Sequence, residues 1–294
     1  MTRLRFKYYM KLSFSDSVER HRFSLKCIPR SDMKQRIVIT HKDVYPNSFI
    51  SEGKDSFGNL MIYGYEESSH KYFFFDIEGE AETGINGLSE PAENSYQTDS
   101  KNSEYRDSSA QNISLFKYQT DVTRPGILIL KYFDELSERY ESESRELFGI
   151  YGTPLNADDS YNYALYVMHR LAMDFNYVSG VTDIQTTAEA AMECGTGVCQ
   201  DYAHIMLSLC RLKKIPSRYV TGMMLGEGMS HAWVEVYSGD RWIGFDPTNS
   251  QLVGDYYIKI AHGRDYSDCL VNQGLFTGNV IQEQEICVNV EEIG

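Results

Sequence analysis

The feature that most restricts the fold of this chain is a strict two-residue alternation close to its start. Apolar side chains occupy every second position there: Leu4, Phe6, Tyr8, Met10, Leu12 and Phe14. Because successive side chains of a strand point to opposite faces, this pattern predicts a strand with one buried face. Further strands are expected at 21–27, 37–39, 60–65 and 72–77, with a turn at 55–59. Residues 1–84 are therefore predicted to form an antiparallel β-sandwich.

A change of composition divides the rest of the chain. Ser, Asn, Glu, Asp and Gln dominate residues 85–114, which are predicted to be a polar linker or a long surface loop. Residues 115–294 show a mixed pattern and are expected to form a second domain, of α+β type, which suits a length of 294 residues. Helices are expected from about 158 onward and over 198–213, and strands over 218–223, 231–237 and 241–245.

Charge and cysteine content restrict the partners and the location. The formal charge is −14, and an acidic surface repels phosphate backbones, which argues against nucleic acid as the main partner. The sequence shows no signal-peptide pattern and no apolar run long enough to cross a membrane, so no membrane association is expected. Six cysteines without a secretion signal predict reduced thiols in a cytoplasmic protein.

Cys199 stands where a reactive cysteine would be expected. Gly195 and Gly197 precede it, and glycine lets the backbone turn sharply into the helix predicted over 198–213. The unpaired N–H groups and the positive dipole end of a helix N-terminus favour a thiolate, which is the nucleophilic form. A buried structural cysteine at a helix start would show the same local pattern, so this segment alone leaves both interpretations open.

The segment 231–246 is predicted to be a β-hairpin that joins a histidine to an aspartate. A two-residue loop at Ser238-Gly239 suits a type I′ turn, and that register sets His231 directly opposite Asp246. With a longer loop the pairing would shift, and a diagonal contact would remain open to the two side chains. A nucleophilic cysteine needs an imidazole and a third group that orients it, so Cys199, His231 and Asp246 are predicted to form a catalytic triad.

Five sequence motifs together closely resemble the transglutaminase-like family of bacterial cysteine proteases. They are TDIQTTA at 182–188, GVCQDYAH at 197–204, IPSRYVTG at 215–222, HAWVEV at 231–236 and GFDPTN at 244–249. The resemblance covers about residues 151–250, and a weaker one at 20–30 and 55–59 links residues 1–84 to the β domain that precedes the core in this family. It implies a papain-like α+β core in which the helix with the cysteine packs on an antiparallel sheet with the histidine and aspartate.

The same resemblance implies a role for each residue of the triad. Cys199 would be the nucleophile, His231 the general base and acid, and Asp246 the carboxylate that orients the imidazole. The leading hypothesis is a thiol-dependent amide hydrolase, a peptidase or isopeptidase, that forms a thioester with a peptide or protein substrate. A transglutaminase, which transfers a glutamine acyl group to an amine, uses the same residues. A binding or scaffold protein is a third hypothesis, from a different class.

Other residues near the triad are weaker candidates. Gln200, beside the nucleophile, is a candidate oxyanion or substrate-binding group, although a side chain at this helix position can also face solvent. Trp233 and Trp242 share the predicted face of His231 and could wall a substrate cleft, although aromatic residues on strands are also typical of plain packing. Cys194, Cys199 and His204 lack the second ligand pair of a zinc site, and no phosphate-binding glycine motif occurs, so neither a metal nor a cofactor is expected.

Overall fold

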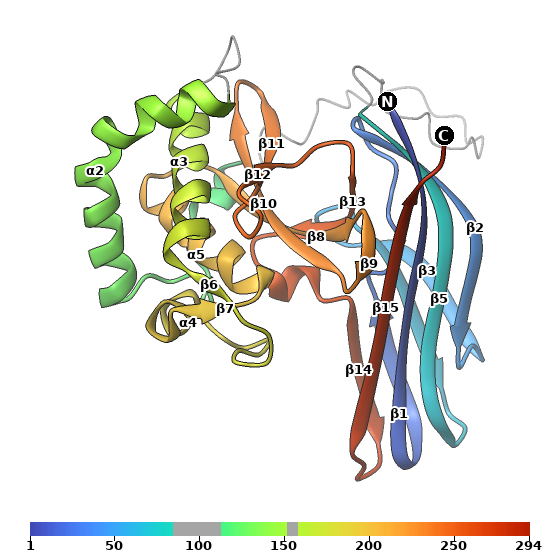
Figure 1. Cartoon of the computed structure of the whole chain (residues 1–294). Coiled ribbons are helices and arrows are strands. Elements are labelled where there is room, and N and C mark those ends of the chain that lie inside the picture. The colour runs from blue at the N-terminus through green and yellow to red at the C-terminus, as the bar shows by residue number, and fades with distance from the viewer. Residues whose placement is uncertain (85–112, 152–157) are drawn as a thin grey trace, which may run out of the picture.

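The computed structural model describes residues 1–84, 113–151 and 158–294. The predicted linker therefore lies outside the described residues, except for its end, where a short 3-10 helix, η1 (Ile113–Lys117), begins. The fold is of α+β type, as predicted, with two large antiparallel sheets and the helices gathered on the far side of the second sheet (Figure 1).

The first sheet is built around one long strand, β1 (Thr2–Leu25). The first half of β1 lies in a part of the sheet whose strand order is β2 (Gln35–Tyr45), β5 (His70–Thr83), β1, β15 (Gln282–Glu292) and β9 (Gly226–Gly228). Its second half pairs instead with β14 (Asn272–Thr277) and with β4 (Leu60–Glu66), which in turn pairs with β3 (Phe49–Lys54). One strand thus belongs to both parts of the sheet (Figure 1).

The alternation that opens the chain is the reason for this arrangement. All six apolar residues at even positions from 4 to 14 are buried, so the first half of β1 has the single buried face that was predicted. Pairing with β5 shifts between Ser13 and Val18, and the strand then takes β4 as its neighbour. The two parts contact each other through the rings of Phe23 and Phe73, whose centroids lie 4.7 Å apart.

The end of the chain returns to the first sheet, which differs from the predicted division at residue 115. β15 runs antiparallel along β1, with Phe6 opposite Val290 and Met10 opposite Ile286. Val288 and Val290 are buried on the same face as Phe6, so their apolar side chains complete the packing of this face. The predicted catalytic segment 115–294 therefore shares its last strands with the N-terminal sheet.

The second sheet carries the predicted site. Its order is β12 (Gln251–Leu252), β11 (Arg241–Asp246), β10 (His231–Ser238), β8 (Ser217–Met224) and β13 (Tyr257–Gly263). Two of the helices, α3 (Asp159–Asp174) and α5 (Cys199–Leu212), pack against β10, and α4 (Ala188–Cys194) and α2 (Ile127–Tyr151) lie outside them (Figure 1). This is the expected layout, with the cysteine helix on the sheet that carries the histidine and the aspartate.

Helix α2 occupies a region where no element was expected. Its apolar residues Ile129, Phe133, Leu136 and Tyr140 recur at helical spacing, and Ile129 and Leu136 are fully buried. The carboxylate of Glu189 on α4 accepts the N–H groups of residues 126, 128 and 129 and so satisfies the first turn of α2. The spacing alone could have predicted this helix.

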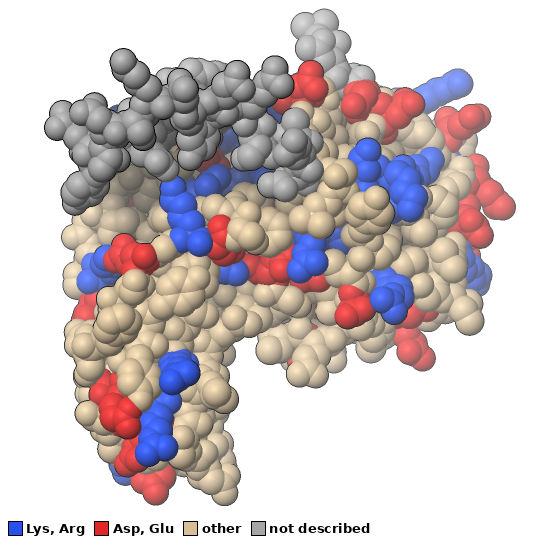
Figure 2. Space-filling model, turned by 180° about the vertical axis from the view of Figure 1, so that it is seen from behind, with Lys and Arg blue, Asp and Glu red and all other residues tan. Residues whose placement is uncertain are grey.

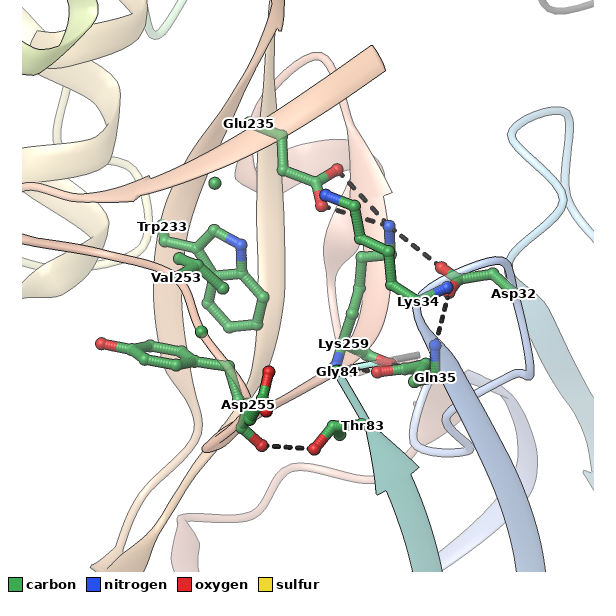
Figure 3. Close-up of a pocket in the computed structure, with 13 residues that line it drawn as sticks. Asp32, Lys34, Gln35, Thr83, Gly84, Trp233, Glu235, Val253, Asp255 and Lys259 are labelled. Atoms are coloured by element: carbon green, nitrogen blue, oxygen red, sulfur yellow. Dashed lines mark hydrogen bonds and ion pairs between the residues drawn. The ribbon is translucent and has the colours of Figure 1, made fainter. Parts of the chain in front are cut away.

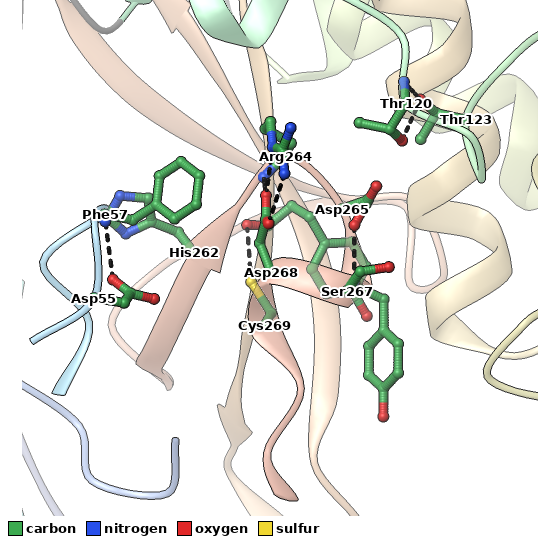
Figure 4. A network of polar contacts seen from close by, with 12 residues as sticks. Asp55, Phe57, Thr120, Thr123, His262, Arg264, Asp265, Ser267, Asp268 and Cys269 are labelled. Atoms are coloured by element: carbon green, nitrogen blue, oxygen red, sulfur yellow. Dashed lines mark hydrogen bonds and ion pairs between the residues drawn. The ribbon is translucent and has the colours of Figure 1, made fainter. Parts of the chain in front are cut away.

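A polar cluster holds the segment that follows β13 (Figure 4). Asp265 accepts the Ser267 N–H at 2.8 Å at the start of a 3-10 helix, η2 (Tyr266–Cys269), and Arg264 forms an ion pair with Asp268 at 2.8 Å.

A short parallel pair of strands, β6 (Asn176–Tyr177) and β7 (Thr196–Gly197), precedes α5. Within the described ranges, no helix has the length and apolar character needed to span a membrane.

Candidate active site

The start of α5 is held by a buried carboxylate. Val198 is the N-cap and Cys199 is the first residue of the helix. The Oδ2 atom of Asp201 accepts the Val198 N–H at 2.7 Å and the Thr182 hydroxyl at 2.7 Å. A Cβ atom on Gly197 would lie only 2.5 Å from the same oxygen, so glycine is needed there for this close approach. These contacts place Cys199 at the exposed end of the helix.

The hairpin of β10 and β11 brings the histidine and the aspartate together in a register that differs from the predicted one. The observed ladder pairs Ser238 with Arg241, so the two-residue loop is Gly239-Asp240 and both loop residues have positive φ, 57° and 61°. His231 is therefore not directly opposite Asp246, and the prediction of that pairing was wrong. Its Nε2 atom reaches Asp246 Oδ2 diagonally, at 2.8 Å.

Asp246 is fully buried, and both of its oxygens accept hydrogen bonds. Oδ2 faces His231 Nε2 at 2.8 Å, the Tyr257 hydroxyl at 2.7 Å and the Asn249 amide at 2.8 Å. Oδ1 accepts the backbone N–H groups of Thr248 and Asn249. Burial acts to raise the pKa of Asp246, but these hydrogen bonds outweigh it and lower that pKa, so the group is a carboxylate at neutral pH.

His231 lies between that carboxylate and the sulfur of Cys199. Burial acts to lower the pKa of His231, but hydrogen bonds with Asp246 and Cys199 outweigh it and raise the pKa to about 10. The ring is therefore an imidazolium at neutral pH, with the carboxylate of Asp246 on one side and the sulfur of Cys199 on the other. The structure thus brings Cys199, His231 and Asp246, the three residues of the predicted triad, together at one site.

A cleft of about 620 Å³ opens above this chain of contacts. Cys199, Gln200 and His231 line it from the core. The opposite wall comes from the first sheet, through Leu12 of β1 and Ile286 of β15. The cleft therefore lies between the two sheets, and the N-terminal part of the chain is one of its sides.

The two tryptophans lie elsewhere, which differs from the prediction that they wall the cleft. Trp233 is 1% exposed, packs its ring against Tyr257 at 5.4 Å, and covers Gly222. Trp242 stacks on the guanidinium of Arg218 at 4.1 Å, near the loop end of the hairpin. Both rings pack against other side chains, Trp233 against Tyr257 and Trp242 against Arg218 and the ring of Phe116 at 5.3 Å.

Trp233 instead lines a second, smaller cavity of about 200 Å³, which lies between the second sheet and the N-terminal part of the chain (Figure 3). Buried charges surround this cavity. Glu235 accepts from Arg218 at 2.6 Å and from Lys259 at 3.3 Å, and Lys259 also pairs with Asp32 at 3.2 Å. Burial acts to raise the pKa of Glu235, but the two cations outweigh it and hold that pKa well below its usual value. The network joins the second sheet to the loop between β1 and β2.

Several residues at the site were not predicted. Asn249 stands three residues after Asp246, so a turn that folds back on the carboxylate could have been read from the motif. Asp201 and Thr182 stand in two of the quoted motifs, but those motifs do not predict the contact between them. Tyr257 has no local signal, because β13 reaches the site only by pairing with β8.

The remaining candidates for chemistry near Cys199 are structural. The structure describes all six cysteines, each as a free thiol, and Cys194 is exposed. His204 is fully buried and accepts the Tyr266 N–H at 3.2 Å through Nε2. Burial lowers the pKa of His204 to about 4, so this side chain stays neutral in the core. Gln200 lines the cleft, but its side chain donates to the Asp183 carbonyl at 3.4 Å.

Comparison with known proteins identifies the core. Residues 151–247 match the family model described as the Transglutaminase-like superfamily, and this range contains Cys199, His231 and Asp246. An uncharacterized protein of Mycobacterium leprae is 33% identical over 128 residues, 40% of this chain and 46% of that protein. One of Mycobacterium tuberculosis is 34% identical over 126 residues, 37% of this chain and 40% of that protein. The chain thus spans less than half the length of these relatives.

A solved structure extends the likeness to the first sheet. The structure of a candidate cysteine protease from Cytophaga hutchinsonii covers 100% of this chain and 91% of its own, with a TM-score of 0.65 and 20% identity. At that identity the likeness concerns the fold, and it includes the N-terminal sheet as well as the core. The family match confirms the predicted resemblance for residues 151–247, which are transglutaminase-like in sequence.

Proposed function

We propose that this protein is a thiol-dependent amide hydrolase, a peptidase or isopeptidase. Cys199 is the nucleophile, and His231 donates a proton to the departing amine. Asp246 orients the imidazole ring and stabilises its protonated form. The observation that carries the proposal is the position of His231, whose Nε2 lies 2.8 Å from Asp246 Oδ2 and which interacts with Cys199 where both residues line an open cleft. The substrate is a peptide or protein that presents a backbone amide or a glutamine side chain.

The reaction follows from these positions. The sulfur of Cys199 bonds to the carbonyl carbon, and the C–N bond breaks as His231 gives its proton to the departing amine, which leaves a thioester. Water then attacks the thioester while His231 takes a proton from it, and the acid and the free cysteine are released. The N–H of Cys199, in the first turn of α5 where helix N–H groups have no intrahelical partner, is the proposed donor to the oxyanion.

Replacement of Cys199 tests the mechanism. The Cys199→Ala variant should lose all turnover of amide substrates, and it should lose the fast phase of labelling by iodoacetamide. Cys194→Ala is the matched control, because Cys194 is an exposed thiol that does not line the cleft. Turnover that survives in Cys199→Ala would exclude the mechanism. A Cys199 that reacts no faster than Cys194 would favour the binding or scaffold hypothesis.

The family match supports transglutaminase activity as the second candidate, because water and an amine compete for the same thioester. Incubation with Gln- and Lys-containing peptides, with and without a labelled amine, separates the two by mass. The proposal expects the free acid as the main product at every amine concentration. An amine adduct that exceeds the acid would assign the protein to the transferases.

We also propose that the protein works in the cytoplasm. The support is the set of six free cysteines, since a reducing compartment keeps thiols from pairing. Cell fractionation with an antibody against the full chain checks this location, and recovery from the periplasmic or extracellular fraction would contradict it.

A further inference from the structure

The cleft at Cys199 has uncharged walls. Apart from Cys199 and His231 themselves, the lining residues that the structure describes include no Asp, Glu, Lys or Arg. Charged residues make up 24% of the chain, and acidic and basic side chains stand close together on the outer surface (Figure 2). The cleft therefore differs in composition from the chain as a whole.

The wall on the core side is apolar even where solvent reaches it. Tyr177, Ile184 and Met229 line the cleft and remain 55%, 59% and 65% exposed. A monomeric protein keeps few large apolar side chains together on its surface unless they bind a partner. Their place beside the nucleophile indicates that the partner is the chain around the reacting amide.

The wall on the sheet side is apolar with a few neutral amides. Met10 stands opposite Ile286 and Leu12 opposite Gln284 across the β1–β15 ladder, and all four line the cleft. The Tyr8 hydroxyl hydrogen-bonds with Ser230, the residue before His231, so this wall reaches the catalytic centre. The amides can meet the polar backbone of a bound peptide, while the apolar side chains leave a charged residue without an ionic partner.

We propose that the cleft selects peptide segments whose side chains next to the reacting amide are uncharged and apolar, and that the first sheet supplies one of the two selecting walls. This inference rests on the proposed function, because it assigns the substrate class of the same site. A charged side chain bound here loses its hydration and gains no counter-charge, whereas a leucine-sized side chain buries apolar area on both sides.

Peptide chloromethyl ketones test the selectivity without a known scissile bond. Three probes carry Leu-Leu, Asp-Asp or Lys-Lys next to the electrophilic carbon. The sulfur of Cys199 displaces chloride, and intact mass gives the rate for the full chain. The Leu-Leu probe should react at least about tenfold faster than either charged probe. Equal rates with fast iodoacetamide labelling of Cys199 would overturn the selectivity and leave the proposed function standing. Slow labelling of Cys199 by every reagent would overturn both.

Matched isoleucine variants locate the effect in the cleft. Ile184→Lys should slow the Leu-Leu probe about tenfold and speed the Asp-Asp probe, and Ile286→Lys should do the same from the sheet side. Ile281→Lys is the control, because Ile281 is 74% exposed and does not line the cleft. The same change of rates in Ile281→Lys as in Ile184→Lys would show that net charge rather than the cleft wall is responsible, and would overturn the proposal.

Discussion

His231 links the site to stability through pH. Its pKa rises from 6.5 to about 10 in the folded state, so between these values the folded chain holds a proton that the unfolded chain has lost. The stabilisation is complete below pH 6.5 and is lost as pH rises through about 10. Urea unfolding across this range should show a steeper loss of stability in the parent than in His231→Gln. Parallel curves for the two proteins would contradict the raised pKa of His231.

Tyr257 should matter to the rate more than to the fold. Its hydroxyl donates to Asp246 Oδ2 at 2.7 Å, and a hydrogen bond to a charged group is worth about 1.5 kcal/mol. Tyr257→Phe should therefore lower kcat/KM about tenfold, with little change in KM. Tyr256→Phe is the matched control, because the Tyr256 ring is 44% exposed and its hydroxyl contacts Glu292 instead. Equal kcat/KM values in Tyr257→Phe and Tyr256→Phe would show that the Tyr257 hydroxyl does not contribute to the reaction.

The residues of the site differ in how far the sequence could predict them. Cys199, His231 and Asp246 each sit in a short motif, so local pattern was sufficient to name them. Trp233 was placed on the right face of β10, but the alternation of a strand does not say what covers that face. Tyr257 could not be predicted, because its contact with Asp246 depends on how β13 pairs, which no local pattern encodes.

At the scale of elements, the start of α5 depends on Asp201. Removal of its carboxylate leaves the Val198 N–H and the Thr182 hydroxyl without their acceptor in a buried place. Asp201→Ala should cost about 2–3 kcal/mol of unfolding free energy and slow the alkylation of Cys199. Asp201→Asn keeps one oxygen acceptor and should lose less of both. Urea unfolding and iodoacetamide kinetics measure the two effects, and full reactivity in Asp201→Ala would contradict the role of this carboxylate.

The hairpin shows why an element can be predicted while its register is not. Ser238-Gly239 and Gly239-Asp240 are both acceptable two-residue loops, because each contains the glycine that a type I′ turn favours. The structure uses the second, with Asp240 in the left-handed region that Asp tolerates. Moving the loop from the first choice to the second gives every residue a cross-strand partner two positions away. Because this shift is even, each side chain stays on the same face of the hairpin. The predicted faces were therefore correct, and the predicted opposition of His231 and Asp246 was not.

For the whole molecule, the buried charges around Glu235 join the second sheet to the loop between β1 and β2. Glu235→Gln keeps the size of the side chain but leaves Arg218 and Lys259 without their shared carboxylate. Because a broken buried ion pair leaves uncompensated charge, unfolding free energy should fall by about 3 kcal/mol. Glu227→Gln, at an exposed position of β9, should change stability by less than about 0.5 kcal/mol. Urea unfolding of both variants checks the difference, and equal losses would show that the network contributes nothing.

The division of the chain was the part of the fold that local patterns could predict least. The alternation in β1 predicts a strand with one buried face, but it does not predict which strands pair with β1 on either side. Phe6 takes Val290 as its partner from the other end of the chain, and a contact so distant in sequence leaves no trace in the spacing of either segment.

The pairing of β1 with β15 also sets an order of events during synthesis. The ribosome releases β1 first, then the core with Cys199 and His231, and only afterwards β15, which carries Ile286. A nascent chain therefore holds its nucleophile before it has the second wall of the cleft. Under the proposed function, the selecting wall that the first sheet supplies is complete only once this last strand has docked beside β1.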